Sequence, residues 1–203
     1  MSSASVESGT RGRTRRAILG AAAEVLARDR AATLADIAKA AEVGRSTLHR
    51  YFPDRDVLVK AAVADAYLVI QQSIQDASVD EGPPVEALRR LVAAMVDTGD
   101  RLLFLYGDSS VLEGFEAGDE EAGAGPDSVA QMMTDLIKRG QAAGVFDPSV
   151  AVQWIQDTVW ALVYTGCDSA SRGVLPRHGV AAAVIRMLEN GIRVQSRGDG
   201  EAQ

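Results

Sequence analysis

The chain has 203 residues and a formal net charge of −7, with 47% hydrophobic and 5% aromatic residues. This length is sufficient for a sizeable core, and the alanine-rich, aromatic-poor composition favours an all-helical protein. A single cysteine, Cys167, excludes an internal disulfide, and the separation of His49 from His178 argues against a structural zinc site. No apolar run approaches the ~18 residues that a membrane span requires, and residues 1–10 lack the apolar stretch of a secretory signal. We therefore expect a cytoplasmic protein with no membrane contact and no metal or other cofactor.

Positive charge gathers at the N-terminal end. Residues 1–60 hold 11 Lys/Arg against 7 Asp/Glu, a net charge of +4, whereas residues 61–203 hold 10 against 21, a net charge of −11. This asymmetry favours polyanion binding at the N-terminal end, with a chance imbalance of surface charge as the alternative. Residues 1–12 are rich in Ser and Gly and are expected to form a flexible basic arm. A cluster of arginines joins this arm to the first helix: Arg11, Arg13, Arg15 and Arg16.

Two helices are predicted next. Residues 14–29 carry the stripe of an amphipathic helix, formed by Ile18, Ala21, Ala22, Val25 and Leu26. After a short break, Thr33 and Asp36 have the spacing of a capping box, which predicts a second helix that ends near Glu42. Gly44 is expected to supply the turn that follows Val43.

Proline and aspartate define the ends of the following helices. A third helix is predicted over residues 45–51, because Pro53 disfavours the helical conformation at Phe52. Asp54 can cap a fourth, long helix that begins at Arg55 or the next residue and continues to about Asp76.

The rest of the chain is predicted to be helical as well. Further helices are expected at residues 84–98, 101–106, 128–143, 149–169 and 176–195, with a Gly/Asp/Glu-rich connection at 107–127. The total is about nine helices and no convincing strand. The fold class is therefore all-α.

The segment from Thr33 to Arg55 has the arrangement of a helix-turn-helix, whose second helix enters the DNA major groove. Arg45 is the best candidate for base readout, because a guanidinium can bind a guanine edge in two places. Thr47 could contact a thymine methyl or a phosphate, while His49, Tyr51 and Arg55 are better placed for the phosphate backbone. An ordinary helical hairpin in a protein core is the alternative.

Residues 13–60 resemble the DNA-binding head of the TetR family of regulators. The sharpest match is the run VGRSTLHRYFPDRDVL at residues 43–58. The resemblance implies a two-fold dimer, a palindromic DNA operator, and repression relieved by a small-molecule ligand in the C-terminal domain. The residues predicted to contact DNA are Thr33, Arg45, Ser46, Thr47, His49, Arg50, Tyr51 and Arg55. Arg55 occupies the place of a family phosphate-binding lysine. His49 replaces the usual tyrosine, but a neutral imidazole can still donate to a phosphate, and Ser46 replaces a frequent glycine.

The sequence divides on this basis into the arm (1–12), the helix-turn-helix domain (13–55), a helical ligand-binding and dimerisation domain (56–196) and a tail (197–203). By the same resemblance the last two long helices form the homodimer interface, with candidate seam residues Val159, Val163, Gly166, Val184, Met187, Leu188 and Gly191; monomer core is the alternative for them. The candidate ligand-binding residues are Met95, Leu103, Phe104, Tyr106, Phe115, Met132, Met133, Trp154, Trp160 and Tyr164. For any single one of them, plain core packing is the alternative and the favoured role.

The function predicted is a ligand-responsive transcriptional repressor in which the fourth helix acts as a lever that changes the spacing of two DNA-binding heads. A helical protein-interaction module without DNA binding is the first alternative. A small helical enzyme is the least favoured, because neither His178 nor Cys167 has an evident catalytic partner and no glycine-rich phosphate loop is present. We therefore do not expect an enzyme.

Overall fold

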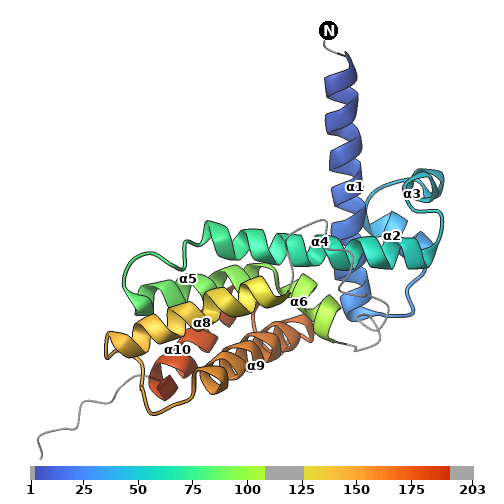
Figure 1. Cartoon of the computed structure of the whole chain (residues 1–203). Helices are drawn as coiled ribbons and strands as arrows, with labels where there is room; N and C mark the ends of the chain where they lie inside the picture. The colour runs from blue at the N-terminus through green and yellow to red at the C-terminus, as the bar shows by residue number, and fades with distance from the viewer. Residues whose placement is uncertain (1–2, 108–125, 193–203) are drawn as a thin grey trace, which may run out of the picture. The chain divides into compact units, whose positions relative to one another are not determined.

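The computed structural model describes residues 3–107 and 126–192, which are largely helical (Figure 1). The elements are α1 (Ser3–Arg28), α2 (Leu34–Ala40), α3 (Arg45–Tyr51), α4 (Arg55–Asp76), α5 (Pro84–Asp97), α6 (Gly99–Tyr106), α8 (Pro126–Ala142), α9 (Val152–Ser171), the 3-10 helix η2 (Arg177–Gly179) and α10 (Val180–Ile192). These described residues contain no β-strand, so the predicted all-α fold class is confirmed. The described chain divides into two compact units.

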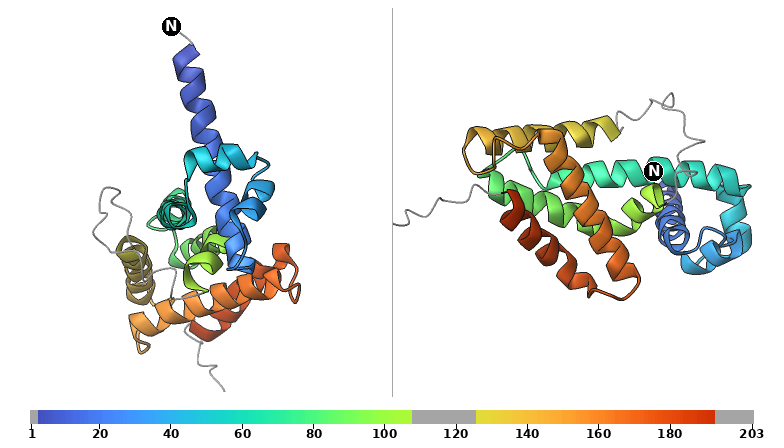
Figure 2. Two further views of the ribbon diagram at one scale, coloured as in Figure 1. Left: turned by 90° about the vertical axis from the view of Figure 1, so that its right-hand side faces the viewer. Right: turned by 90° about the horizontal axis from the view of Figure 1, so that it is seen from below.

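The first unit contains residues 3–72 and 98–107 of the described chain, and α1 is its central element. The apolar stripe predicted for this helix is buried at Ile18, Ala22 and Leu26, and it packs against both α2 and α6 (Figures 1 and 2). Burial of such a stripe supplies most of the stability of an amphipathic helix.

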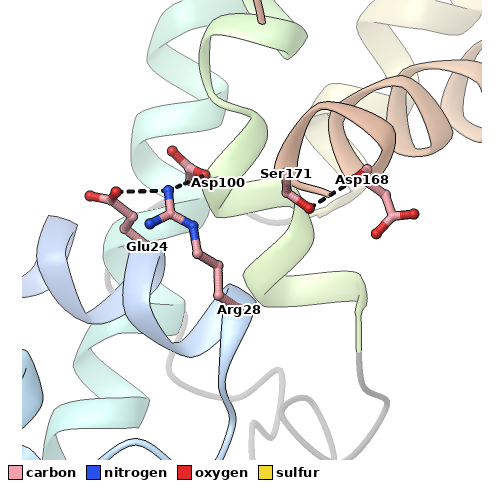
Figure 3. A network of polar contacts seen from close by, with 5 residues as sticks. All are labelled: Glu24, Arg28, Asp100, Asp168 and Ser171. Carbon is pink, nitrogen blue, oxygen red and sulfur yellow. Dashed lines mark hydrogen bonds and ion pairs between the residues drawn. The ribbon is translucent and has the colours of Figure 1, made fainter. Parts of the chain in front are cut away.

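Ion pairs and hydrogen bonds also join α6 to this unit. Arg28 lies 2.8 Å from Glu24 on its own helix and 4.0 Å from Asp100 at the start of α6 (Figure 3). The Arg30 guanidinium donates to the carbonyls of Leu103, at 3.1 Å, and Phe104, at 2.7 Å. Both carbonyls lie in the C-terminal part of α6, where backbone donors run out, and the Leu103 carbonyl also accepts from the Gly107 N–H at 3.0 Å. Arg30 therefore caps this helix end.

The second unit contains residues 73–97 and 126–192 of the described chain. Within it α5 packs against α8, α9 and α10 (Figure 2). Close approach of α9 to α10 depends on Gly166, because a Cβ atom there would lie 2.8 Å from a Val180 methyl carbon. Near the end of α9, Ser171 donates to the Asp168 carbonyl at 2.8 Å (Figure 3).

Two arginines hold the turn between α4 and α5. Arg90 of α5 donates to the carbonyls of Ala77, Ser78 and Glu81 at 2.7 to 2.8 Å. Arg139 of α8 donates to the Val79 carbonyl at 2.8 Å and also to the Asp80 carbonyl. Each guanidinium satisfies carbonyls that no helix pairs, which fixes the path of the chain between α4 and α5.

Several element boundaries differ from the sequence predictions. The arm expected at residues 1–12 is helical from Ser3 onward, since extending a nucleated helix fixes only one residue for each new hydrogen bond. The helix expected from residue 176 is a 3-10 turn followed by α10, which begins at Val180. The connection at 107–127 and the tail at 197–203 lie mostly or wholly outside the described residues.

The expected domain boundary at residue 55 also differs from the division of the structure. The first unit includes most of α4 and all of α6, which the sequence assigned to the ligand-binding domain. The physical reason is that α1 has a wide apolar face, and α6 covers the part of it that α2 leaves open.

One helix in the described part of the chain, α4, is long and apolar enough to cross a membrane by length and composition alone, with a mean hydropathy of 1.3. The sequence analysis expected no such stretch. A core helix passes the same test, and α4 buries Leu58, Ala62 and Ala66. Its central Asp65 lies 3.9 Å from Arg101 of α6.

Candidate DNA-binding surface and effector cavity

The capping box predicted at the start of α2 is present. The Thr33 hydroxyl accepts from the Asp36 backbone N–H at 3.3 Å, and the Asp36 carboxylate accepts from the Thr33 N–H at 2.8 Å. That carboxylate also accepts the Thr33 hydroxyl proton at 2.6 Å. These hydrogen bonds from Thr33 lower the pKa of Asp36 below its ordinary value. Thr33 is exposed, but its hydroxyl proton is already engaged by Asp36, so a DNA phosphate would have to compete for it.

The turn between α2 and α3 is built differently from the prediction. The Val43 N–H donates to the Ala38 carbonyl and the Glu42 N–H donates to the Lys39 carbonyl, the two bonds of a Schellman motif. The left-handed residue is Glu42, with a φ of 55°, whereas Gly44 has a φ of −67° and is the N-cap of α3. The sequence predicted the turn at Gly44. In the structure the Schellman motif places the turn residue two positions earlier, at Glu42.

Helix α3 has the bounds predicted from the sequence and presents a polar edge to solvent. Leu48 and Phe52 anchor it in the core of the first unit, with exposed fractions of 0% and 2%. Four predicted DNA-contacting residues are exposed, namely Arg45, Ser46, His49 and Arg50, while Thr47 and Tyr51 are half-buried. The Arg50 guanidinium lies over the Tyr51 ring, 5.8 Å from its centroid. The structure therefore places donors of this helix on one accessible edge.

His49 has an exposed ring with a backbone neighbour. Its Nδ1 atom lies 3.4 Å from the Pro53 carbonyl oxygen, and the tautomer of the ring decides which nitrogen carries the proton. The neutral tautomer with the proton on Nε2 can donate to a phosphate oxygen, so the phosphate contact of His49 stays a prediction.

Arg55 does not point its guanidinium at solvent as a phosphate ligand would. Its Nη1 donates to the Ala32 carbonyl and its Nη2 donates to the Arg30 carbonyl. The residue is half-buried and holds the loop between α1 and α2. These hydrogen bonds give Arg55 a structural role, and its phosphate contact stays a prediction. Because these partners are 23 and 25 residues away in the sequence, no local pattern indicates them.

The second unit contains a cavity of about 440 Å³ between the end of α4 and α8. It is lined by Ile74, Gln75, Val79, Asp80, Met132, Asp135, Leu136 and Arg139. In the described part of the chain, no Lys or Arg nitrogen lies within 4.0 Å of the Asp80 or Asp135 carboxylate. The lining combines an apolar wall with the exposed carboxylates of Asp80 and Asp135 and with the guanidinium of Arg139. The Asp135 carboxylate also accepts from Gln131 Nε2 at 2.8 Å.

The predicted ligand-binding residues are mostly elsewhere. Only Met132 lines the cavity, and Met95 and Met133 are fully buried core residues. Leu103, Phe104 and Tyr106 belong to α6 in the first unit, and Phe115 lies outside the described residues. On α9, Trp154 is 67% exposed, and Trp160 and Tyr164 are half-buried. The sequence analysis missed Asp80, Asp135 and Arg139. The α8 spacing of Met132, Asp135 and Arg139 is the signal that places them on one face.

Comparison with known proteins agrees with this geometry. A sequence model described as "Bacterial regulatory proteins, tetR family" matches residues 18–62, which run from the buried part of α1 into α4. The transcriptional repressor LfrR of Mycolicibacterium smegmatis is 39% identical over 192 residues, covering 95% of this chain and 97% of LfrR. The chain belongs to the TetR family.

Two further comparisons agree with this assignment. The transcriptional regulator NfxB of Pseudomonas aeruginosa is 30% identical over 160 residues, covering 79% of this chain and 84% of NfxB. The crystal structure of LfrR from Mycobacterium smegmatis in complex with proflavine has a TM-score of 0.67 and 33% identity, and the match covers 92% of this chain and 99% of that one. This TetR-family chain is therefore a DNA-binding transcriptional regulator with a helix-turn-helix formed by α2 and α3.

Proposed function

We propose that the chain is a repressor that binds a palindromic operator as a homodimer and leaves it when a small molecule binds the second unit. The observation that carries the proposal is the α3 edge, where Arg45, Ser46 and His49 are exposed while Leu48 is fully buried. A helix of this kind can present its donors to base edges without unfolding any of the core. Arg45 is the proposed base-reading residue, and Arg50 is proposed to contact phosphate.

The homodimer is proposed to use the outer faces of α9 and α10. The seam residues predicted from the sequence need correction, because five of the seven are buried within the chain itself: Val159, Val163, Gly166, Val184 and Leu188. Met187 is 63% exposed and Gly191 is exposed. Trp154 and Val174, each 67% exposed, are further large apolar side chains of this region that a second copy would cover.

The effector is proposed to be an apolar, cationic compound bound in the α4–α8 cavity. LfrR from Mycobacterium smegmatis has been crystallised in complex with proflavine, which we take as the probe for this proposal. The cavity supplies the apolar Ile74 and Leu136 and the carboxylates of Asp80 and Asp135. A volume of about 440 Å³ is within the range of small-molecule sites.

The test is DNA binding by fluorescence anisotropy with a duplex from the region upstream of the gene that encodes this chain. Wild type should bind this duplex more tightly than an arbitrary duplex of equal length. Arg45→Ala should reduce that preference by about 5- to 150-fold, equivalent to ~1–3 kcal/mol for one bidentate base contact. Arg172→Ala removes an equal charge from an exposed site of the second unit and should change nothing. Binding to no DNA at all would favour the alternative of a protein-interaction module.

The effector part of the proposal has its own test. Proflavine added to the protein–DNA complex should lower the anisotropy, and Asp135→Asn should raise the concentration needed. Gln131→Ala, which removes the 2.8 Å hydrogen bond to Asp135 and keeps the carboxylate, serves as the matched control. An equal proflavine response in wild type and Asp135→Asn would exclude this cavity as the site.

A further inference from the structure

The N-terminal half of α1 has no role in the core. The first buried residue of this helix in the described chain is Ile18, and residues 9–17 are exposed except for the half-buried Thr14. Figures 1 and 2 show the first turns of α1 standing clear of α2, α3 and α4. At ~1.5 Å rise per residue, the stretch from Gly9 to Ile18 is about 14 Å long. This exposed stretch is polar on all sides, so it buries no apolar stripe against the rest of the unit.

The charge of this exposed half points to a polyanion. The part of α1 from Ser3 to residue 23 contains four arginines and one acidic residue, Glu7. Two of them have neighbours within the unit: the Arg15 guanidinium lies 5.7 Å from the Phe52 ring centroid, and both Arg15 and Arg16 act electrostatically on Asp65. Among the residues whose side chains are described, no carboxylate oxygen lies within 4.0 Å of Arg11 or Arg13, and Arg13 donates to the Thr10 hydroxyl at 3.1 Å. Both arginines are exposed on a segment whose charge is positive.

The position of this half relative to α3 identifies the anion. Phe52 is the C-cap of α3, so the contact with Arg15 places α1 beside the end of the proposed recognition helix. Arg11 is four residues before Arg15 and lies on the same side of α1, one turn further out. When α3 occupies a major groove, this outer turn continues past it toward the adjacent sugar-phosphate backbone.

We propose that the N-terminal half of α1 is a second DNA-binding element, in which Arg11 and Arg13 bind phosphates that flank the groove occupied by α3. This inference rests on the proposed function, since it takes the α3 edge as the DNA-reading surface. The contacts are to phosphates alone, so they add affinity and salt dependence without adding sequence preference. The bound DNA segment is correspondingly longer than the half-sites that α3 reads.

The experiment compares wild type with the double variant Arg11→Ala, Arg13→Ala at 50 and 200 mM KCl, on the upstream duplex and on an arbitrary duplex. Each lost phosphate contact lowers the slope of log affinity against log salt by about 0.9, so two contacts should lower it by about 1.8. The ratio of wild-type to variant DNA affinity should therefore be about 12-fold larger at 50 mM KCl than at 200 mM KCl, on both duplexes. Alanine favours helix, so circular dichroism should show unchanged helicity.

The matched control is Arg172→Ala, Arg177→Ala, which removes two arginines from exposed positions of the second unit and should keep the wild-type slope. A second arm trims the upstream duplex at both ends: wild type should lose affinity and the double variant should not. The inference is overturned if the Arg11/Arg13 variant has the wild-type slope of log affinity against log salt. It is also overturned if the variant changes self-association and leaves DNA binding unchanged, because the helix would then contact another copy of the chain. Failure of the proposed function is distinguishable, because it removes the preference for the upstream duplex in wild type.

Discussion

Replacing Arg55 with alanine tests whether this side chain stabilises the fold or binds DNA. The guanidinium donates to the carbonyls of Ala32 and Arg30, and a hydrogen bond from a charged donor contributes about 1.5–3 kcal/mol. Part of the loop is exposed at Ala31 and Thr33, so water can replace some of the lost bonding. We therefore expect Arg55→Ala to lower the free energy of unfolding by about 2–3 kcal/mol. This is close to the contribution of one such hydrogen bond and smaller than the sum of two.

The assay is thermal and urea unfolding followed by circular dichroism. For a chain of this size each kcal/mol shifts Tm by ~2–4 °C, so Arg55→Ala should lower Tm by about 4–12 °C. The Tm of Arg55→Lys should lie between those of wild type and Arg55→Ala, because an ammonium cannot donate to two carbonyls in the geometry of a guanidinium. An unchanged Tm, together with a salt slope for DNA binding reduced by about 0.9, would refute the structural role and restore the phosphate contact.

Three further predictions concern the fold. A methyl group added by Gly140→Ala would overlap the buried Phe146 ring, so we expect the free energy of unfolding, measured by urea unfolding, to fall by ~1–3 kcal/mol. An unchanged urea midpoint would contradict this packing. Glu42→Gly relieves the left-handed conformation and should raise the free energy of unfolding by roughly 0.5–1 kcal/mol in the same assay, whereas a loss would show that Glu42 makes a compensating contact. Hydrogen bonds with Thr33 lower the pKa of Asp36. The ionised Asp36 carboxylate therefore stabilises the folded state above the ordinary carboxyl pKa, and this contribution disappears as the pH falls through the lowered pKa. The stability difference between wild type and Asp36→Asn, measured by urea unfolding, should therefore shrink from about pH 7 to pH 3, and a constant difference would exclude ionisation as its cause.

Local chemistry predicted the DNA-binding head well. The bounds of α3, its end before Pro53 and the capping box of Thr33 and Asp36 all depend on residues within four positions of one another. Asp54 likewise caps α4 as expected, accepting from the Val57 N–H at 2.9 Å. Such interactions can be recognised from spacing because both partners are in the same few turns of chain.

Contacts between distant parts of the chain could not be predicted in this way. Arg30 reaches carbonyls 73 and 74 residues away, and nothing in its neighbours distinguishes it from a solvated arginine. The ligand-binding prediction chose aromatic and methionine side chains by type, yet type does not decide whether a side chain fills the core or borders a cavity. Met132 and Met133 are adjacent on α8, but Met132 lines the cavity and Met133 is buried in the core.

The place of α6 in the first unit has a consequence for protein engineering. A fragment cut after α4 would lack the helix that covers part of α1 and would expose apolar side chains such as Ile18 and Leu19. The smallest portable reader of DNA from this chain is therefore discontinuous, consisting of residues 3–72 joined to 98–107. A chimera that grafts this head onto a foreign sensor would need a short linker in place of the second unit's α5, so that both pieces are transplanted together.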